Sequence, residues 1–325
     1  MTHAIRIHQP GGPEVLRWEA LDAPAPSAGE VALRHTAVGL NYIDVYHRTG
    51  FYPTPTPFTP GLEAAGVVTA LGANVTSLKV GDRVAYATGP VGAYSEARVI
   101  AADRVVKIPE AITDHQAAAM MLQGMTVEYL VRRTYQIKRG DMVLVHAAAG
   151  GVGLILCQWA KHLGATVIGT VSSDEKAALA RANGCDHPVV YTREDFQARV
   201  MEITNGAKVP VVYDSVGRDT FNKSLDCLAP MGLLALFGQA SGPVPPFDLG
   251  LLAAKGSLFV TRPTLFSYTA KRADLEASAA ALFDVVQRGV VKITVNQTYA
   301  LRDAAQAHRD LEARRTTGST LFTVS

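Results

Sequence analysis

The chain has 325 residues, 48% of them hydrophobic and 18% charged, which is enough apolar material for two cores, and a single core rarely grows beyond ~250–300 residues. The net charge of +2 gives no electrostatic reason to expect a nucleic acid or a membrane as a partner. The longest apolar runs, such as LLALF at 233–237, are far shorter than the ~18–20 residues that span a bilayer, and the polar amino terminus does not resemble a secretory signal.

The three cysteines, Cys157, Cys185 and Cys227, lie far apart in the sequence. They match neither a paired disulfide framework nor a CxxC metal site. We interpret them as small buried hydrophobic residues that stay reduced, and we therefore expect a cytoplasmic protein.

The first third of the chain is rich in short β-branched runs separated by turn residues, which predicts a β-rich unit. The runs are VALRHTAVGL (31–40), GVVTALG (66–72), GDRVAY (81–86), EARVI (96–100) and DRVVKI (103–108).

From about residue 123 the pattern changes to strands that alternate with helices. MVLVHA (142–147) is a continuous apolar strand, and apolar residues then recur at helical spacing up to Leu163, before Gly164. Such alternation predicts a parallel sheet covered on both faces, which is an α/β fold. The further predicted elements are strands at 165–171, 187–191, 209–217, 232–238 and 257–261 and helices at 174–183, 193–203, near 219–228 and at 271–289. We expect the shorter elements that follow to pair with the first domain.

The turn HAAAGGVG (146–153) lies between the apolar strand and the first of these helices. Ala148-x-Gly150-x-x-Gly153 matches the dinucleotide fingerprint, except that alanine occupies the first position. Gly150 lets the backbone approach a pyrophosphate, and Gly153 lets the helix pack on the strand. A glycine turn kept only for packing is the alternative, but the position at the start of a βαβ series favours a nucleotide. The candidate phosphate-binding residues are Ala149, Gly150, Gly151, Val152 and Gly153.

The end of the second strand indicates which dinucleotide is bound. Sites that prefer NAD usually offer Asp or Glu there, whereas this chain has Ser172, 19 residues beyond Gly153. Lys176 follows one helical turn later and suits a 2′-phosphate, although a solvated helix residue is the alternative interpretation. Asp174 and Glu175 weigh slightly the other way, although a preference of acidic residues for the amino terminus of a helix is the alternative interpretation. NADPH is the favoured cofactor.

Several motifs together resemble one known family along nearly the whole chain. They are GLNYIDVYHRTGFY (39–52), PGLEAAGVV (60–68), GDRVAY (81–86), AAAGGVG (147–153), VVYDSVG (211–217), GSLFVTRPTL (256–265) and LEARRTTGSTLF (311–322). This set resembles the medium-chain dehydrogenase/reductase superfamily and, within it, the zinc-free NADPH:quinone oxidoreductases of the zeta-crystallin type. The resemblance implies a GroES-like β-rich catalytic domain over 1–122 and 265–325. It also implies a Rossmann doubly wound parallel-sheet domain that binds NADPH over 123–264.

The sequence departs from the zinc-dependent members of that superfamily. Asn41 stands where they have a ligand cysteine, and Leu62 stands where they have a histidine, so that only Glu63 remains. A further expected cysteine is missing near Leu122 and Gln123. Because leucine cannot hold zinc, we expect no metal. Without a Lewis acid, alcohol oxidation is disfavoured, whereas a quinone is already electrophilic.

The resemblance also implies site residues. Those expected to line the nicotinamide and substrate are Asn41, Tyr46, Tyr52 and Thr126; the 2′-phosphate pocket is expected from Ser172, Lys176, Tyr191 and Arg314; further cofactor contacts are expected from Ser215, Phe237, Gly238, Gln239, Phe259, Val260 and Arg262. Loop packing is the alternative for Tyr52, and a surface charge is the alternative for Arg262. We interpret His146 as a packed strand residue.

The leading hypothesis is an NADPH-dependent quinone reductase that transfers hydride without metal in a cleft between the two domains. A reductase of α,β-unsaturated carbonyls is the closest alternative. A non-catalytic relative that binds NADPH or RNA is a third, although the chain has no basic run to suggest RNA. The family resemblance also implies a homodimer joined through the strand at 257–261.

Overall fold

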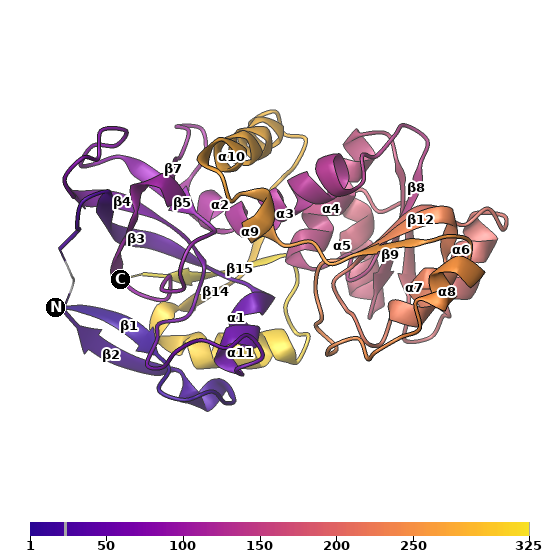
Figure 1. The fold of residues 1–325 in the computed structure, drawn as a ribbon, viewed down its shortest axis with the longest axis horizontal. Helices are drawn as coiled ribbons and strands as arrows, with labels where there is room; N and C mark the ends of the chain where they lie inside the picture. Colours follow the sequence, from indigo (N-terminus) through magenta and orange to yellow (C-terminus); the bar gives the residue numbers. More distant parts are fainter. Residues whose placement is uncertain (23–24, 325) are drawn as a thin grey trace. The chain divides into compact units, whose positions relative to one another are not determined.

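The computed structural model describes residues 1–22 and 25–324, which Figure 1 shows as a ribbon coloured along the sequence. Contacts divide the chain into two units. The first unit comprises Met1–Met125, Tyr268–Gln287 and Ile293–Ser325, and the second comprises Thr126–Ser267 and Arg288–Lys292. The chain therefore passes between the units four times.

The first unit is built around a largely antiparallel sheet whose long central strand is β3 (Glu30–Leu40). One edge of β3 pairs with β4 (Glu63–Leu71), and the other pairs with β6 (Ala97–Ala101) and β15 (Ser319–Thr323). The strand order is β14-β15-β3-β4-β5-β7. The other strands of the unit are β5 (Arg83–Tyr86), β7 (Val106–Lys107) and β14 (Val295–Ala300), and β1 (Thr2–Arg6) pairs separately with β2 (Arg17–Leu21).

The first unit also contains helices and 3₁₀ turns. They are α1 (Tyr42–Arg48), α2 (Asp114–Ala118), α10 (Arg272–Gln287), α11 (Ala304–Glu312) and the 3₁₀ turns η1 (Pro13–Val15), η2 (Ala102–Arg104) and η4 (Leu301–Asp303). The core combines Leu33 of β3 with Phe322 of β15, and the edge of the Tyr94 ring meets Phe322 with the ring centroids 4.8 Å apart. The core of the first unit therefore depends on strands from both ends of the chain.

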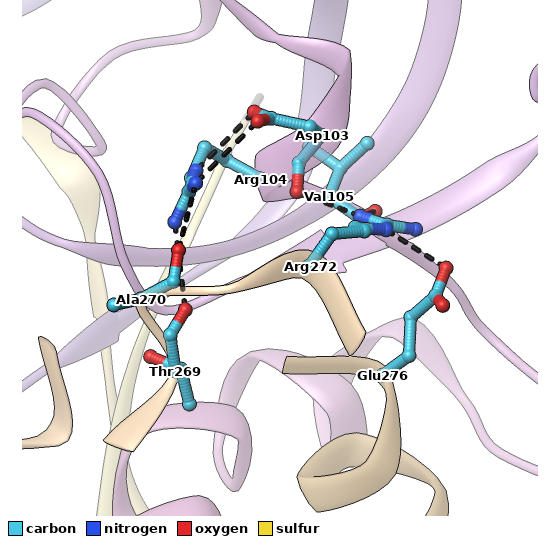
Figure 2. Close-up of polar contacts among 7 residues, drawn as sticks. All are labelled: Asp103, Arg104, Val105, Thr269, Ala270, Arg272 and Glu276. Atoms are coloured by element: carbon cyan, nitrogen blue, oxygen red, sulfur yellow. Dashed lines mark hydrogen bonds and ion pairs between the residues drawn. The ribbon is translucent and has the colours of Figure 1, made fainter. Parts of the chain in front are cut away.

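Two arginines attach α10 to the turn η2, as Figure 2 shows. Arg272 donates to the backbone carbonyls of Asp103 (2.8 Å) and Val105 (2.6 Å), and Arg104 donates to the carbonyl of Ala270 (3.2 Å). These bonds from charged donors satisfy backbone carbonyls of the turn η2, of Val105 after it and of Ala270 before α10. They hold the segment that re-enters the first unit against its amino-terminal part.

The second unit contains a six-stranded parallel sheet in the order β10-β9-β8-β11-β12-β13. This is the doubly wound Rossmann arrangement, in which the strand order reverses beside the first strand. Its strands are β8 (Met142–Val145), β9 (Thr166–Val171), β10 (His187–Val190), β11 (Val209–Asp214), β12 (Leu228–Leu236) and β13 (Phe259–Thr261). The predicted α/β fold class, with a β-rich unit beside a Rossmann unit, is confirmed.

Helices cover both faces of the parallel sheet. Figure 1 shows α4 and α5 on one face and α6, α7 and α8 on the other. Their bounds are α4 (Gly151–His162), α5 (Asp174–Ala182), α6 (Phe196–Ile203), α7 (Phe221–Asp226) and α8 (Gly250–Ala254). Three further helical segments are α3 (Met121–Tyr129), α9 (Leu265–Tyr268) and a π-helical turn at Leu130–Thr134. None of the described helices is both long and apolar enough to cross a membrane.

Local sequence signals explain where the helices of the second unit begin and end. Gly164 follows α4 with φ +92°, a conformation that glycine adopts without strain. Ser173 caps α5, because its side chain accepts the backbone N–H of Lys176. Asp195 caps α6 in the same way, so that helix begins at Phe196, three residues after the predicted start. Strand β12 begins at Leu228, four residues before the predicted strand.

Candidate active site

The turn between β8 and α4 has a backbone that side chains would obstruct. Ala147 is exposed and has φ +54°, a left-handed conformation that is unusual for alanine. A Cβ on Gly153 would lie 2.7 Å from the carbonyl carbon of Ala148, which is closer than real Cβ atoms come. A Cβ on Gly150 would meet only the Ala147 carbonyl, at 3.2 Å. Gly153 is therefore required by packing, whereas Gly150 is required only if something else approaches.

The start of α4 suits an anionic group. Gly150 is the N-cap and contributes no side chain, and the first turn of this 12-residue helix contains no acidic residue. The first N–H groups of a helix lack partners within the helix and carry its positive dipole end. The predicted segment from Ala149 to Gly153 thus offers a pyrophosphate bare N–H groups at the carboxyl edge of a parallel sheet, and its geometry fits a dinucleotide.

The end of β9 is where the ribose of a dinucleotide is expected. Ser172 follows β9, Lys176 lies half-buried in the first turn of α5, and Tyr191 follows β10 with 39% of its surface exposed. Arg193 makes a bidentate ion pair with Asp174 at 2.6 Å for both bonds, and this arginine lowers the pKa of Asp174. Of the two carboxylates that weigh towards NAD in the sequence, Asp174 therefore already has a cationic partner.

The ends of the strands β11 and β12 lie against each other at the carboxyl edge of the sheet. The carbonyl of Asp214 at the end of β11 accepts the N–H of Phe237 (2.8 Å), and a Cβ on Gly238 would lie 2.6 Å from the Ser215 carbonyl. The structure thus brings together Ser215, Phe237, Gly238 and Gln239. Arg262, just after β13, donates to the carbonyl of Leu236 at 3.1 Å, and Val260 packs on the core while Phe259 is 60% exposed.

In the first unit, Asn41 lies in a buried chain of polar side chains. Its Nδ2 donates to Glu63 Oε2 (2.6 Å), and its Oδ1 accepts from Gln123 Nε2 (3.2 Å). The oxygen of the same side-chain amide, Gln123 Oε1, accepts the hydroxyl of Ser319 at 2.9 Å. Glu63 Oε1 accepts the backbone N–H of Leu122 at 2.8 Å. Asn41 is therefore held in one amide orientation, and its second N–H remains available as a donor.

Burial raises the pKa of Glu63 to about 8, while its hydrogen bonds from Asn41 and Leu122 act in the opposite direction. Burial also raises the pKa of the neighbouring Asp44, to about 7. Asp44 Oδ2 accepts the backbone N–H of Asn41 (2.9 Å) and the hydroxyl of Tyr94 (2.8 Å). Two buried carboxyl groups thus accept hydrogen bonds from Asn41, one from its backbone and one from its side chain.

A second polar chain continues from Tyr94 towards the surface. The Tyr94 hydroxyl lies 3.1 Å from His308 Nε2, and Arg48 lies 3.1 Å from His308 Nδ1. Arg48 also forms a bidentate pair with Glu312, with both bonds at 2.8 Å. Burial, together with the charge of Arg48, lowers the pKa of His308 to about 3, so the imidazole is neutral and links the two groups.

An aromatic cluster follows Asn41 on α1 and the loop after it. The Tyr46 and Tyr52 rings meet edge to face with centroids 5.2 Å apart, and Phe51 lies 5.4 Å from Tyr46. The structure therefore brings the predicted residues Tyr46 and Tyr52 together. Thr126 is buried on α3, one turn after Gln123. Arg314 lies in the first unit just after α11, whereas Ser172, Lys176 and Tyr191 lie in the second.

Sequence reasoning missed most of the buried polar network. The sequence marks Gln123 only as a residue near the position of a missing cysteine, and no motif assigns a role to Asp44, Arg48 or His308. Leu62 is buried beside Glu63. Within residues 1–22 and 25–324, no three His, Cys, Asp or Glu side chains cluster so as to hold a metal ion. The absence of a bound metal remains a prediction.

The fold is that of a two-domain dehydrogenase, and comparisons with known proteins give the same class. Residues 27–110 match the family described as alcohol dehydrogenase GroES-like domain, and residues 151–282 match the zinc-binding dehydrogenase family. The predicted GroES-like character of the first unit is confirmed.

Full-length relatives define the family more narrowly. A quinone oxidoreductase of Pseudomonas aeruginosa is 54% identical over 99% of both chains, and a 2-haloacrylate reductase of a Burkholderia species is 47% identical over 98% of both. The crystal structure of Escherichia coli quinone oxidoreductase complexed with NADPH superposes with a TM-score of 0.97, at 48% identity over 99% of both chains. The chain belongs to the quinone oxidoreductase family of the medium-chain dehydrogenases/reductases.

Two glycine substitutions should separate folding from dinucleotide binding. Gly153→Ala pushes a methyl group into backbone and should lower the free energy of unfolding by about 1–3 kcal/mol. Gly150→Ala meets one contact, at 3.2 Å, in a conformation (φ −81°) that alanine tolerates, so stability should change by less than about 1 kcal/mol. Its dinucleotide affinity should nevertheless fall at least about tenfold. Chemical denaturation and nucleotide fluorescence titration measure the two effects; equal affinities of Gly150→Ala and the unaltered protein would contradict the phosphate assignment.

The raised pKa of Glu63, about 8, predicts a pH-dependent stability. The folded protein keeps this proton to higher pH than the unfolded chain does, so the stability that Glu63 contributes falls as pH rises from its ordinary pKa near 4.5 to about 8. Glu63→Gln lacks this titration, and the variant should gain stability relative to the unaltered protein between about pH 5 and about pH 9. Denaturant midpoints of both proteins across this range test it. A difference in stability that stays constant across this range would show that Glu63 does not titrate in this window.

Proposed function

We propose that this protein is an NADPH-dependent quinone reductase that works without a metal. The observation that carries the proposal is the bare turn from Ala147 to Gly153, which leads into the unobstructed start of α4. Family membership supports the quinone as the acceptor, because the quinone oxidoreductases of Pseudomonas aeruginosa and Escherichia coli are about half identical to this chain along their length.

The preference for NADPH rests on the end of β9. Ser172 replaces the acidic residue that would bind the ribose hydroxyls of NAD, and Lys176 lies in the following helical turn. Tyr191 adds a hydroxyl. Arg314, which the family resemblance also implies for the 2′-phosphate, belongs to the first unit. A cation near hydroxyl donors suits a dianionic phosphate better than a neutral ribose.

The residues of the first unit supply orientation and hydrogen bonding. NADPH, when bound, supplies the hydride. Asn41 has one N–H committed to Glu63, so its second N–H can donate to the oxygen on which charge develops as the acceptor is reduced. Gln123 holds the amide from the other side. Tyr46 and Tyr52 offer flat aromatic faces and hydroxyls for a planar acceptor, and Thr126 is assigned beside the nicotinamide.

A reductase of α,β-unsaturated carbonyls is the second candidate function. A relative named 2-haloacrylate reductase is 47% identical over 98% of this chain, and an activated double bond accepts hydride on the same apparatus. The donor from Asn41 would then bind a carbonyl or carboxylate oxygen of the acceptor.

We also propose a cytoplasmic homodimer. Among the described strands, β13 ends the parallel sheet and pairs only with β12. Among the described residues of the second unit, the most exposed large apolar side chains are Met231 (72%), Leu249 (71%) and Phe259 (60%). An open sheet edge with exposed apolar residues favours pairing with a second copy. A mass near 34.6 kDa in solution, measured by sedimentation, would remove the dimer.

The proposed function is tested by following NADPH and NADH oxidation by the chelator-treated protein. The acceptors are 1,4-benzoquinone and, separately, an enone. We expect fast turnover with NADPH and the quinone that chelation does not reduce. Faster turnover with the enone would favour the second candidate, and no turnover with either acceptor would refute both.

Lys176→Ala should raise the KM for NADPH about tenfold or more and leave the KM for NADH almost unchanged, because only NADPH carries the 2′-phosphate. Lys161→Ala is a matched control, since Lys161 lies on α4 and pairs with Asp186. The control should preserve the ratio of the two KM values. An equal loss with both cofactors in Lys176→Ala would contradict the 2′-phosphate assignment.

A further inference from the structure

A buried chain of polar side chains lies beneath the dinucleotide turn of the second unit, and the proposed chemistry does not use it. Its centre is His146, which directly follows β8 and is 1% exposed. His146 Nδ1 lies 2.9 Å from the Thr170 hydroxyl, and Nε2 lies 2.9 Å from the Ser224 hydroxyl. The ring also meets Phe196 edge to face at 4.9 Å. The imidazole therefore bridges groups from β9 and α7.

The carboxylate of Asp214, at one end of this row of polar side chains, fixes the direction of each of its hydrogen bonds. Ser224 donates to Asp214 Oδ2 at 3.2 Å, so the Ser224 oxygen must accept from His146 Nε2. A neutral imidazole then has an unprotonated Nδ1, which accepts the Thr170 hydroxyl. Burial lowers the pKa of His146, which keeps the ring neutral. The Thr170 oxygen in turn accepts the backbone N–H of Ala147 at 3.4 Å.

The two ends of the chain are two loops at the carboxyl edge of the sheet. One end is the N–H of Ala147, the exposed left-handed residue that opens the glycine turn. The other is Asp214, whose Oδ1 accepts the N–H groups of Val216 (2.7 Å) and Gly217 (3.1 Å) and so shapes the turn that carries Ser215. These are the two turns assigned to the cofactor. In the contacts that the structure gives for the described residues, His146 touches Thr170, Ser224 and Phe196 and no charged side chain.

We propose that His146 is a positioning residue for the dinucleotide, because it locks the 147–153 turn and the 214–217 turn in one mutual arrangement. The inference rests on the proposed function, since it needs a nucleotide on those turns. Core packing alone would not require a histidine: an apolar side chain would fill the space against Phe196. A neutral donor and acceptor on one rigid ring is what joins a threonine on one side to a serine on the other.

The test uses a matched pair at Thr170, because a large change at His146 can disturb folding. Thr170→Val keeps the shape and removes the hydroxyl, whereas Thr170→Ser keeps the hydroxyl. We expect Thr170→Val to weaken NADPH and NADH binding alike, by about tenfold, with kcat at saturating cofactor within about twofold. Thr170→Ser should restore most of the affinity. Ser224→Ala and His146→Leu should weaken binding in the same way as Thr170→Val.

Thr204→Val serves as the structural control. Thr204 is another buried threonine of the same unit, whose hydroxyl bonds to the carbonyl of Val200 at the end of α6. It should lower stability without changing cofactor affinity. Fluorescence titration with NADPH and with NADH, done well below the unfolding temperature, measures the affinities.

The outcomes distinguish this inference from the proposed function. If Thr170→Val and Thr170→Ser both bind NADPH as tightly as the unaltered protein does, the positioning role is wrong and the proposed function stands. A fall in kcat with unchanged affinity would also overturn the role of His146. If the unaltered protein binds no NADPH, both the inference and the proposed function fail. If the variants lose affinity for NADPH but not for NADH, the effect concerns the 2′-phosphate, and this result would also contradict the positioning role of His146.

Discussion

The close approach of α4 to the end of β8 is the constraint on which the second unit depends. The first turn of the helix packs directly on the backbone of Ala147 and Ala148, and only a residue without a side chain fits at Gly153. That contact aims the unpaired N–H groups of the helix at the edge where the strand order reverses. Ala147 accepts a strained backbone conformation in the same turn. The cofactor site is therefore a consequence of how one helix is seated on one strand.

The first unit keeps ionisable side chains inside a β-rich core. Glu63 and Asp44 are fully buried, yet each accepts bonds from donors that the fold places against it. The result is a rigid frame of hydrogen bonds around Asn41. Preorganised donors of this kind can stabilise charge on an acceptor without any movement at the moment of reaction. Both units thus use buried chains of hydrogen-bonded polar side chains to support the residues of their proposed sites.

Local signals in the sequence predicted the second unit well. Each of its signals lies in consecutive residues: the apolar strands, the helical spacing up to Leu163 and the glycine turn. The structure has each of these elements close to its expected bounds. The site of the first unit was harder to predict, because its partners are distant in the chain: Arg48 meets His308 across 260 residues, and Gln123 meets Ser319 across 196. No spacing rule links such pairs, and a single buried histidine or glutamine resembles many others. The family resemblance identified Asn41 and Tyr46 but not the residues that hold Asn41 in place.

The position of β15 beside β3 has a consequence for how the protein is made. The central sheet of the first unit is incomplete until residues 319–323 pair with residues 37–40, while every strand of the second unit lies within residues 142–261. Pairings that close such long loops form slowly. During synthesis, the Rossmann sheet can therefore assemble while β3 still has one edge half open and aggregation-prone. Removal of β15 would leave β14 without its partner strand and would expose that edge permanently.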